Sequence, residues 1–222
     1  GQPVPAMPTY LRQRMVLFLL EAAGGRLGKM DLQKLLFLYG QERGTRDYAF
    51  VPYQFGCYSF QAAADVELLE AAGWLETEGN TLHLRTAPGA APWAARSWDR
   101  QEMRDWLTGH PRRGTGLVRE IYMRYPYYAI RSKMKERVLD PETLRRVEDL
   151  AQKLNRPGTV LFTLGYEGIA FEDFVNKLIW NGVRLLCDVR ANPLSRKFGF
   201  SRRNLETLLP KLDIQYAHVP EL

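Results

Sequence analysis

Two sequence patterns meet in the stretch Asn155-Arg156-Pro157-Gly158-Thr159-Val160-Leu161-Phe162-Thr163-Leu164. Pro157 and Gly158 interrupt the helical register that precedes them. The six residues that follow, 159–164, form an apolar run typical of a buried strand. We therefore expect a domain boundary at 155–158, with helices before it and a parallel sheet after it.

After this boundary, strands and helices alternate. Beyond the strand at 159–164, the pattern predicts a helix at 171–180, a strand at 184–189, a helix at 202–210 and a strand at 214–219. Such alternation implies right-handed crossovers and a parallel sheet. Three strands are few for a sheet of this kind. The sequence thus predicts that 156–222 is the start of an α/β, Rossmann-like domain, truncated in a chain that is a fragment.

Before the boundary, residues 9–84 show the order of a winged helix. The pattern predicts helices at 9–23 and 29–42, an extended aromatic stretch at 48–57, a helix from 59 to 72 capped by Ser59, and a hairpin at 74–84 around Gly79-Asn80. Three helices followed by a hairpin are typical of winged-helix proteins. We expect an α+β, winged-helix-like helical module here.

The remaining segments are a tail and a connector. Residues 1–8 are expected to be a loose tail or a cloning remnant. Residues 85–155 are expected to be a basic helical connector, with an Ala/Pro/Gly-rich stretch at 86–98 and helices at 99–108, 115–124 and 140–154. Asp140-Pro141-Glu142 is a strong start signal for the last of these helices.

Composition and charge limit the classes of protein that fit. A hydrophobic fraction of 45% predicts a packed protein, and the apolar runs are too short to cross a bilayer. Two cysteines, Cys57 and Cys187, are too few for a disulfide framework, so the sequence favours a cytoplasmic protein in which both are buried. Neither has metal-ligand spacing, and we expect no metal or cofactor.

The net charge of +6 is concentrated in the middle of the chain. Residues 1–84 hold 7 Lys/Arg and 9 Asp/Glu, whereas residues 85–137 hold 12 and 5. Tyrosines interleave with the cations, a combination that binds phosphates and unstacked bases. The predicted nucleic-acid-binding residues are Arg112, Arg113, Arg131, Lys133, Lys135 and Arg137. The alternative is a solvated helical face with Tyr122, Tyr125, Tyr127 and Tyr128 packed into the core.

The third predicted helix raises a different question. It carries Gln61, Asp65, Glu67 and Glu70 but no Lys or Arg. A helix that reads DNA has to approach phosphates without repulsion. A module for protein contacts or homodimerisation therefore competes with DNA binding as the role of residues 9–84.

Polar residues follow each strand predicted after the boundary. Ligands bind at the carboxyl ends of strands in parallel α/β sheets, so we expect these residues to line one pocket. The candidate catalytic residues are Glu167, Asp188 and Arg190, and the candidate ligand-binding residues are Gly165, Tyr166, Ser195, Arg196, His218 and Glu221. In the alternative, Asp188 and Arg190 pair with each other or cap loops.

The same C-terminal residues resemble a known family. The motifs are Thr163-Leu164-Gly165-Tyr166-Glu167-Gly168, Asp188-Val189-Arg190 with Pro193 and Ser195, Phe200-Ser201 with Leu205, and Tyr216, His218 and Pro220-Glu221-Leu222. This order resembles the domain of unknown function 488 family, which implies further strands and a Cys-His-Arg-like segment after Leu222. Residues 32–37 and 50–53, with Gly56, resemble Panacea-type antitoxin-associated domains. Neither resemblance implies a settled activity.

Two hypotheses follow for function. In the first, the chain is a nucleic-acid-associated protein, in regulation or phage defence, whose α/β domain binds or processes a nucleotide or modified base. In the second, it is a toxin–antitoxin-like or scaffold protein that acts through protein contacts without catalysis. The charge of 85–137 favours the first hypothesis, and the acidic residues of 1–84 favour the second.

Overall fold

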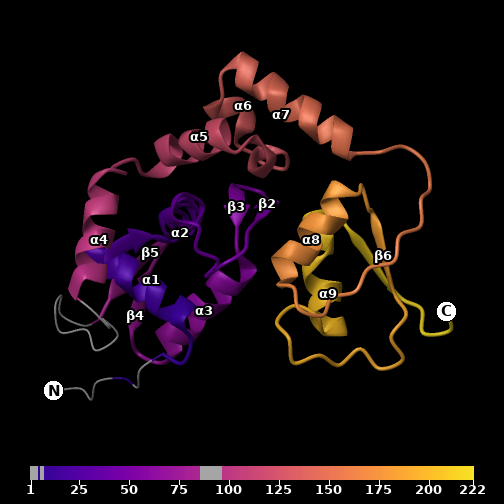
Figure 1. Cartoon of the computed structure of the whole chain (residues 1–222), viewed down its shortest axis with the longest axis horizontal. Helices are drawn as coiled ribbons and strands as arrows, with labels where there is room; N and C mark the ends of the chain where they lie inside the picture. The colour runs from indigo at the N-terminus through magenta and orange to yellow at the C-terminus, as the bar shows by residue number, and fades with distance from the viewer. Residues whose placement is uncertain (1–4, 6–7, 86–96) are drawn as a thin grey trace.

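The computed structural model describes residues 5, 8–85 and 97–222 (Figure 1). We call residues 9–84 the N-terminal module, 97–155 the connector and 156–222 the C-terminal unit. The module contains α1 (Leu11–Ala22), β1 (Arg26–Gly28), α2 (Lys29–Arg43), β2 (Val51–Tyr53), β3 (Gly56–Tyr58), α3 (Phe60–Ala71), β4 (Leu75–Glu78) and β5 (Thr81–Leu84). The predicted helices and the hairpin are confirmed. Strand β1 was not predicted, because three residues are too few to show a period.

The module has two small antiparallel sheets, β1-β5-β4 and β2-β3. In the first, Leu27 of β1 lies opposite Leu82 of β5, and both side chains are buried. The turn of the second requires Gly56, which has a φ of +95°; a Cβ there would lie 2.6 Å from the Tyr122 ring. This glycine thus allows the hairpin to pack closely against the connector.

Buried polar side chains fix the start of α3. Gln33 of α2 exchanges two hydrogen bonds with the backbone of Ser59, at 2.9 and 3.0 Å. The Ser59 hydroxyl accepts the Ala62 N–H at 3.1 Å, which is the predicted N-cap. Lys34 is also buried, and its ammonium group donates to the Cys57 carbonyl at 2.8 Å. Gln33 and Lys34, which carried part of the Panacea resemblance, therefore join α2 to the β3–α3 connection.

The sequence groups Asp65 with the acidic residues of α3 that would face DNA, but the structure places its side chain in the core. Its side chain is buried and accepts hydrogen bonds from Arg12 Nε and from the Tyr48 hydroxyl, both at 2.7 Å. It belongs to the core because it is satisfied by these donors. The exposed acidic residues of α3 are therefore Glu67 and Glu70.

The connector contains α4 (Ser97–Thr108), α5 (Gly114–Arg124), the 3-10 helix η1 (Pro126–Ala129), α6 (Lys135–Val138) and α7 (Pro141–Leu154). The three predicted helices are confirmed, and the Asp140 carboxylate accepts the Thr143 N–H at 2.9 Å to cap α7. Helices η1 and α6 were not predicted because they are only four residues long. Most of the stretch predicted at 86–98 and of the tail at 1–8 lies outside the described residues.

The C-terminal unit contains α8 (Phe171–Trp180), β6 (Leu185–Asp188), α9 (Arg202–Leu208), the 3-10 helix η2 (Pro210–Leu212) and β7 (Gln215–His218). Strands β6 and β7 are parallel, as predicted, with Asp188 opposite His218. The architecture is mixed α/β with small sheets.

The strand predicted at 159–164 is wrong. Among the described residues these form no strand, and Leu161 is 92% exposed. An apolar run predicts that a segment is buried, but a strand forms only when its backbone pairs with another strand. In the described part of the chain, β6 pairs with β7 alone. The two remaining strands do not establish a Rossmann-like sheet.

The connector arches from the module to the C-terminal unit, which lies beside β2, β3 and α3 (Figure 1). Asn176 of α8 donates to the Phe50 carbonyl at 2.8 Å and accepts from the Tyr127 hydroxyl at 2.7 Å. The rings of Tyr127 and Trp180 stack at 5.0 Å. In the part of the chain that the structure describes, none of the helices has both the length and the apolar character needed to cross a bilayer.

Candidate functional site

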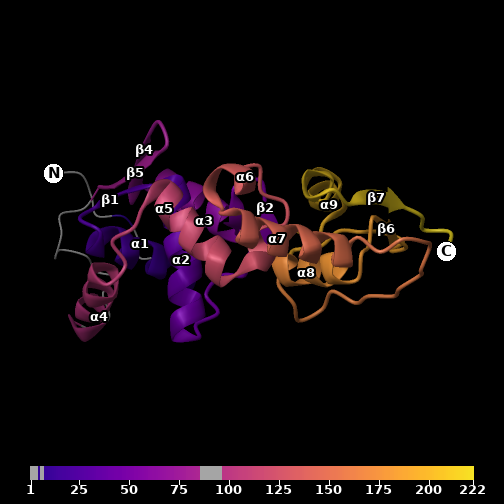
Figure 2. The same cartoon turned by 90° about the horizontal axis from the view of Figure 1, so that it is seen from above.

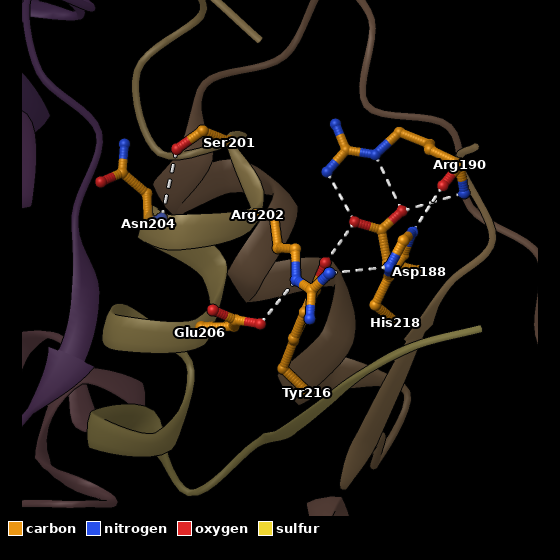
Figure 3. Close-up of polar contacts among 8 residues, drawn as sticks. All are labelled: Asp188, Arg190, Ser201, Arg202, Asn204, Glu206, Tyr216 and His218. Carbon is orange, nitrogen blue, oxygen red and sulfur yellow. Dashed lines mark hydrogen bonds and ion pairs between the residues drawn. The ribbon is translucent and has the colours of Figure 1, made fainter. Parts of the chain in front are cut away.

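The candidate site lies where β6 and β7 end side by side (Figure 3). Asp188 is the last residue of β6, and His218 is the last residue of β7. Their parallel register brings the two side chains together although 30 positions separate them. The expectation that parallel strand ends meet therefore holds for this pair of strands.

Asp188 is the centre of the site and is almost fully buried. Its carboxylate accepts hydrogen bonds from Arg190 Nε at 2.8 Å, from Arg190 Nη2 at 2.7 Å and from the Tyr216 hydroxyl at 2.5 Å. Burial acts to raise the pKa of Asp188, but these hydrogen bonds outweigh it and lower the pKa to about 2. Such a weak base holds cations and hydroxyl groups in place better than it accepts a proton at neutral pH.

Arg190 is held on two sides. The hydrogen bonds to Asp188 raise the pKa of Arg190, and its guanidinium lies 5.1 Å from the centre of the Tyr166 ring. Its third nitrogen, Nη1, is buried and has no hydrogen-bond partner among the described residues. Arg190 thus joins the 165–168 loop to the end of β6, and the expected pairing of Asp188 with Arg190 is present.

The hydrogen bonds of His218 fix its tautomer. Nε2 lies 2.7 Å from the Arg190 carbonyl oxygen, which only accepts, and Nδ1 lies 3.0 Å from Arg202 Nη1, which only donates. His218 therefore carries its proton on Nε2 and is neutral in this arrangement. Arg202 also pairs with Glu206 at 2.7 Å, so that its guanidinium is held at the rim of the site (Figure 3).

Sequence reasoning did not choose Tyr216, Lys197 or Arg202 as site residues. Tyr216 is one of the residues on which the family resemblance rests, and its place two residues before His218 on the same strand puts both side chains on one face. The Lys197 ammonium donates to the Tyr166 carbonyl at 3.3 Å. Arg202 begins α9 directly after its N-cap, Ser201. For Lys197 and Arg202 the sequence holds no local signal, because their contacts depend on the tertiary fold.

The other predicted site residues lie outside this set of contacts. Glu167, Arg196 and Glu221 are exposed, and no hydrogen bond or ion pair of theirs occurs in the described part of the chain. The Ser195 hydroxyl accepts the Lys197 N–H at 3.2 Å, within its own loop. Gly165 is exposed and has open space around it. The structure therefore unites Tyr166, Asp188, Arg190 and His218, and a pocket that also includes Glu167 and Ser195 stays a prediction.

The predicted nucleic-acid-binding residues fall into two groups. In the first group, each guanidinium is held within the protein. Arg112 pairs with Glu120 at 2.9 Å, and Arg113 donates to the His110 carbonyl at 2.6 Å. Arg131 donates to the Leu212 carbonyl. In contrast, the side chains of Lys133, Lys135 and Arg137 make no ion pair or hydrogen bond within the described residues.

The tyrosines near these cations are used for packing. Tyr122 is fully buried, Tyr125 and Tyr128 pack edge-on against Phe37, and Tyr127 stacks on Trp180. This arrangement agrees with the alternative in which the tyrosines belong to the core. It leaves the exposed cations, without an aromatic platform, as the groups available to phosphates.

The two cysteines are free, and only Cys57 is buried as expected. Cys187 is exposed because it lies, like Leu185, on the exposed face of β6. Within 5, 8–85 and 97–222, His, Cys, Asp and Glu side chains form no group of three that would hold a metal ion.

Comparison with known proteins supports the resemblance of the C-terminal unit. No curated protein and no solved structure matches the chain. The winged-helix and Panacea-type resemblances of the module stay predictions. Residues 170–222, which hold α8, β6, α9 and β7, match the model of the family described as Domain of unknown function DUF488.

Proposed function

We propose that the chain is a nucleic-acid-associated protein that contacts phosphates through a basic surface shared by the connector and the C-terminal unit. The basic surface consists of Lys133, Lys135, Arg137, Arg203 and Lys211. The observation that carries the proposal is the contact of Arg131 with the Leu212 carbonyl. It joins the segment that holds the first three cations to the segment that holds Lys211.

The state of these five side chains supports the proposal. All are at least partly exposed, and none makes a side-chain hydrogen bond or ion pair in the described part of the chain. Helices α6 and α9, which carry most of them, lie on the same side of the molecule in Figure 2. Exposed cations without a partner attract a phosphate backbone and release its counterions.

Helix α3 is a poor candidate for the DNA-reading element. Glu67 and Glu70 are exposed on it, and its first turn is covered by Glu172 of α8. Negative side chains repel phosphates, and a covered N-terminus is not free to enter a groove. In this proposal the module holds the basic surface in place and does not read bases through α3.

The β6–β7 site adds a place for one anionic group of a nucleotide. Arg202 and Lys197 contact His218 and Tyr166, beside an Asp188–Arg190 pair whose charges cancel. The cluster therefore favours binding of a phosphate group. Because Asp188 is a weak base, we propose that this site binds a ligand and assign no proton transfer to Asp188.

A triple substitution tests the basic surface. Fluorescence anisotropy with fluorescein-labelled 20-nucleotide single strands and duplexes measures binding between 50 and 200 mM salt. Lys133→Ala, Lys135→Ala and Arg137→Ala together should weaken duplex binding by ten-fold or more at 50 mM salt. The log–log salt slope should fall by about 0.9 for each phosphate that the variant no longer neutralises.

The matched control removes three exposed cations of α7, by Arg145→Ala, Arg146→Ala and Lys153→Ala. It changes the net charge equally and should leave most of the binding. Equal weakening in the two triple variants would mean that only net charge matters. Absence of binding by the unmodified chain would reject the proposal.

A second candidate function, protein–protein contact through the module, is favoured by the outer face of α3. Leu68 is 58% exposed there, between acidic side chains. An exposed apolar side chain on an acidic helix suits a protein partner or a second copy better than DNA. Light scattering tests the second copy: a dimer that Leu68→Glu converts to a monomer would support this function.

A further inference from the structure

Glu172, in the first turn of α8, is a buried carboxyl group at the contact between the C-terminal unit and the N-terminal module. Its side chain is 1% exposed, and its Oε1 accepts the Gln61 N–H at 2.9 Å. Gln61 is the second residue of α3, so its N–H has no acceptor within the helix. A side chain of one unit thus caps a helix of the other, beside the cap that Ser59 supplies to Ala62.

Among the described residues, no cation compensates the charge of Glu172. From α3 it faces the backbone N–H groups of Phe60 and Gln61, and on α8 its charged neighbour is Asp173, which has the same sign. In the 198–200 segment, Phe198 and Phe200 pack against Phe171, the residue that precedes Glu172 in the chain. Lys197, the nearest cation in that segment's sequence, directs its ammonium group to the Tyr166 carbonyl instead.

The balance of these effects favours the neutral acid. Hydrogen bonds from N–H groups favour the carboxylate, but burial without a cation costs more. Burial therefore raises the pKa of Glu172 from 4.5 to about 7. A carboxyl group in this position changes its charge within the range of pH that proteins meet in cells.

The rest of the α8 contact does not titrate in that range. Asn176 contributes neutral hydrogen bonds to Phe50 and Tyr127, and Trp180 contributes ring stacking. Burial raises the pKa of Tyr127 well above its ordinary value, so its hydroxyl keeps its proton. Burial lowers the pKa of Arg131, which contacts Leu212, but an arginine side chain stays protonated throughout this range.

We propose that Glu172 is a proton-controlled link between the two units: the neutral acid holds α8 against α3, and the carboxylate weakens that contact. Because the docked form binds the proton more tightly, docking is strongest below pH 4.5. Its strength falls as the pH rises through about 7, and is level above that. This inference does not depend on nucleic-acid binding. It identifies the α8–α3 contact as the part of the molecule that responds to pH.

Hydrogen exchange in the full chain, followed by NMR from pH 4.5 to 8, tests this link. The readout is the protection factor of the Gln61 amide, which is the exchange rate corrected for its intrinsic pH dependence. The Ala62 amide in the same turn is the internal control, since its acceptor is Ser59. We expect Gln61 protection to fall by up to about tenfold per pH unit as Glu172 ionises, relative to Ala62.

Two variants sharpen the test. Glu172→Gln keeps an oxygen acceptor without an ionisable group, so the ratio of Gln61 to Ala62 protection should stay constant over the whole pH range. Glu148→Gln, an equal change at an exposed position of α7, should behave as the unmodified chain does. If Glu172→Gln does not fold, the unmodified chain still decides. A Gln61 ratio that stays constant or rises with pH overturns the proposal, as does a fall that Glu172→Gln retains.

Discussion

Glu172 and Asp188 are both buried carboxyl groups of the C-terminal unit, yet their surroundings shift their pKa values in opposite directions. Glu172 faces neutral N–H groups and an acidic neighbour, and its pKa rises to about 7. Asp188 faces a guanidinium group and a tyrosine hydroxyl, and its pKa falls to about 2. Burial opposes ionisation at both positions, and in the described part of the chain Asp188 has a cation to compensate for it whereas Glu172 has none.

This difference assigns different roles to the two regions. The β6–β7 site holds a fixed pair of charges that suits it to bind and orient a ligand. The α8–α3 contact holds a charge that appears and disappears with pH. Substitutions that remove the fixed charge pair at one site or the titrating group at the other test this comparison.

The largest effect is expected from Arg190→Ala. It leaves the Asp188 carboxylate buried without its cation, and the free energy of unfolding should fall by about 3 kcal/mol at pH 7. Urea unfolding measures this decrease. The exposed Arg196→Ala is the control, with a change within about 0.5 kcal/mol. If Arg190→Ala is as stable as the control, the pair does not stabilise the end of β6.

Glu172→Gln should act in the opposite direction at neutral pH. The raised pKa means that Glu172 stabilises the docked structure below its ordinary value of 4.5 and loses this contribution as the pH rises through about 7. The variant should therefore gain on the order of 2 kcal/mol relative to the unmodified chain between pH 4.5 and 8. A stability difference that does not vary with pH would show that Glu172 is not shifted.

A smaller effect is expected from Tyr216→Phe, which removes one of the donors to Asp188. Loss of a hydrogen bond to a carboxylate should cost about 1.5 kcal/mol and raise the pKa of Asp188. Tyr58→Phe serves as the control, because the Tyr58 hydroxyl makes no hydrogen bond among the described residues. An equal decrease in stability in both variants would trace the effect to the ring environment.

Local signals in the sequence were enough to predict much of the fold. Ser59, Asp140-Pro141 and Gly79-Asn80 act within a few residues of their own positions, and each begins a helix or closes a turn where predicted. Residues 159–164 failed because a strand depends on a partner strand, which composition does not reveal. β1 is visible only through its pairing with β5.

The candidate site was also predictable only in part, because some of its residues follow from the order of the elements and others depend on the tertiary fold. Asp188, Arg190 and His218 follow from the rule for strand ends, which needs only the order of the elements. Arg202 and Lys197 reach the site through tertiary contacts with His218 and Tyr166. Glu172 looks like an ordinary acidic residue in the first turn of a helix, and it accepts a hydrogen bond from Gln61, which is 111 positions away.

The most direct measurement is a carboxyl-carbon NMR titration of Glu172 and Asp188 in the full chain between pH 3 and 8. The account predicts that Glu172 titrates at about pH 7, and that Asp188 stays ionised over the whole range because its pKa is about 2. A midpoint for Glu172 near 4.5, or one for Asp188 above its ordinary 3.8, would contradict the account.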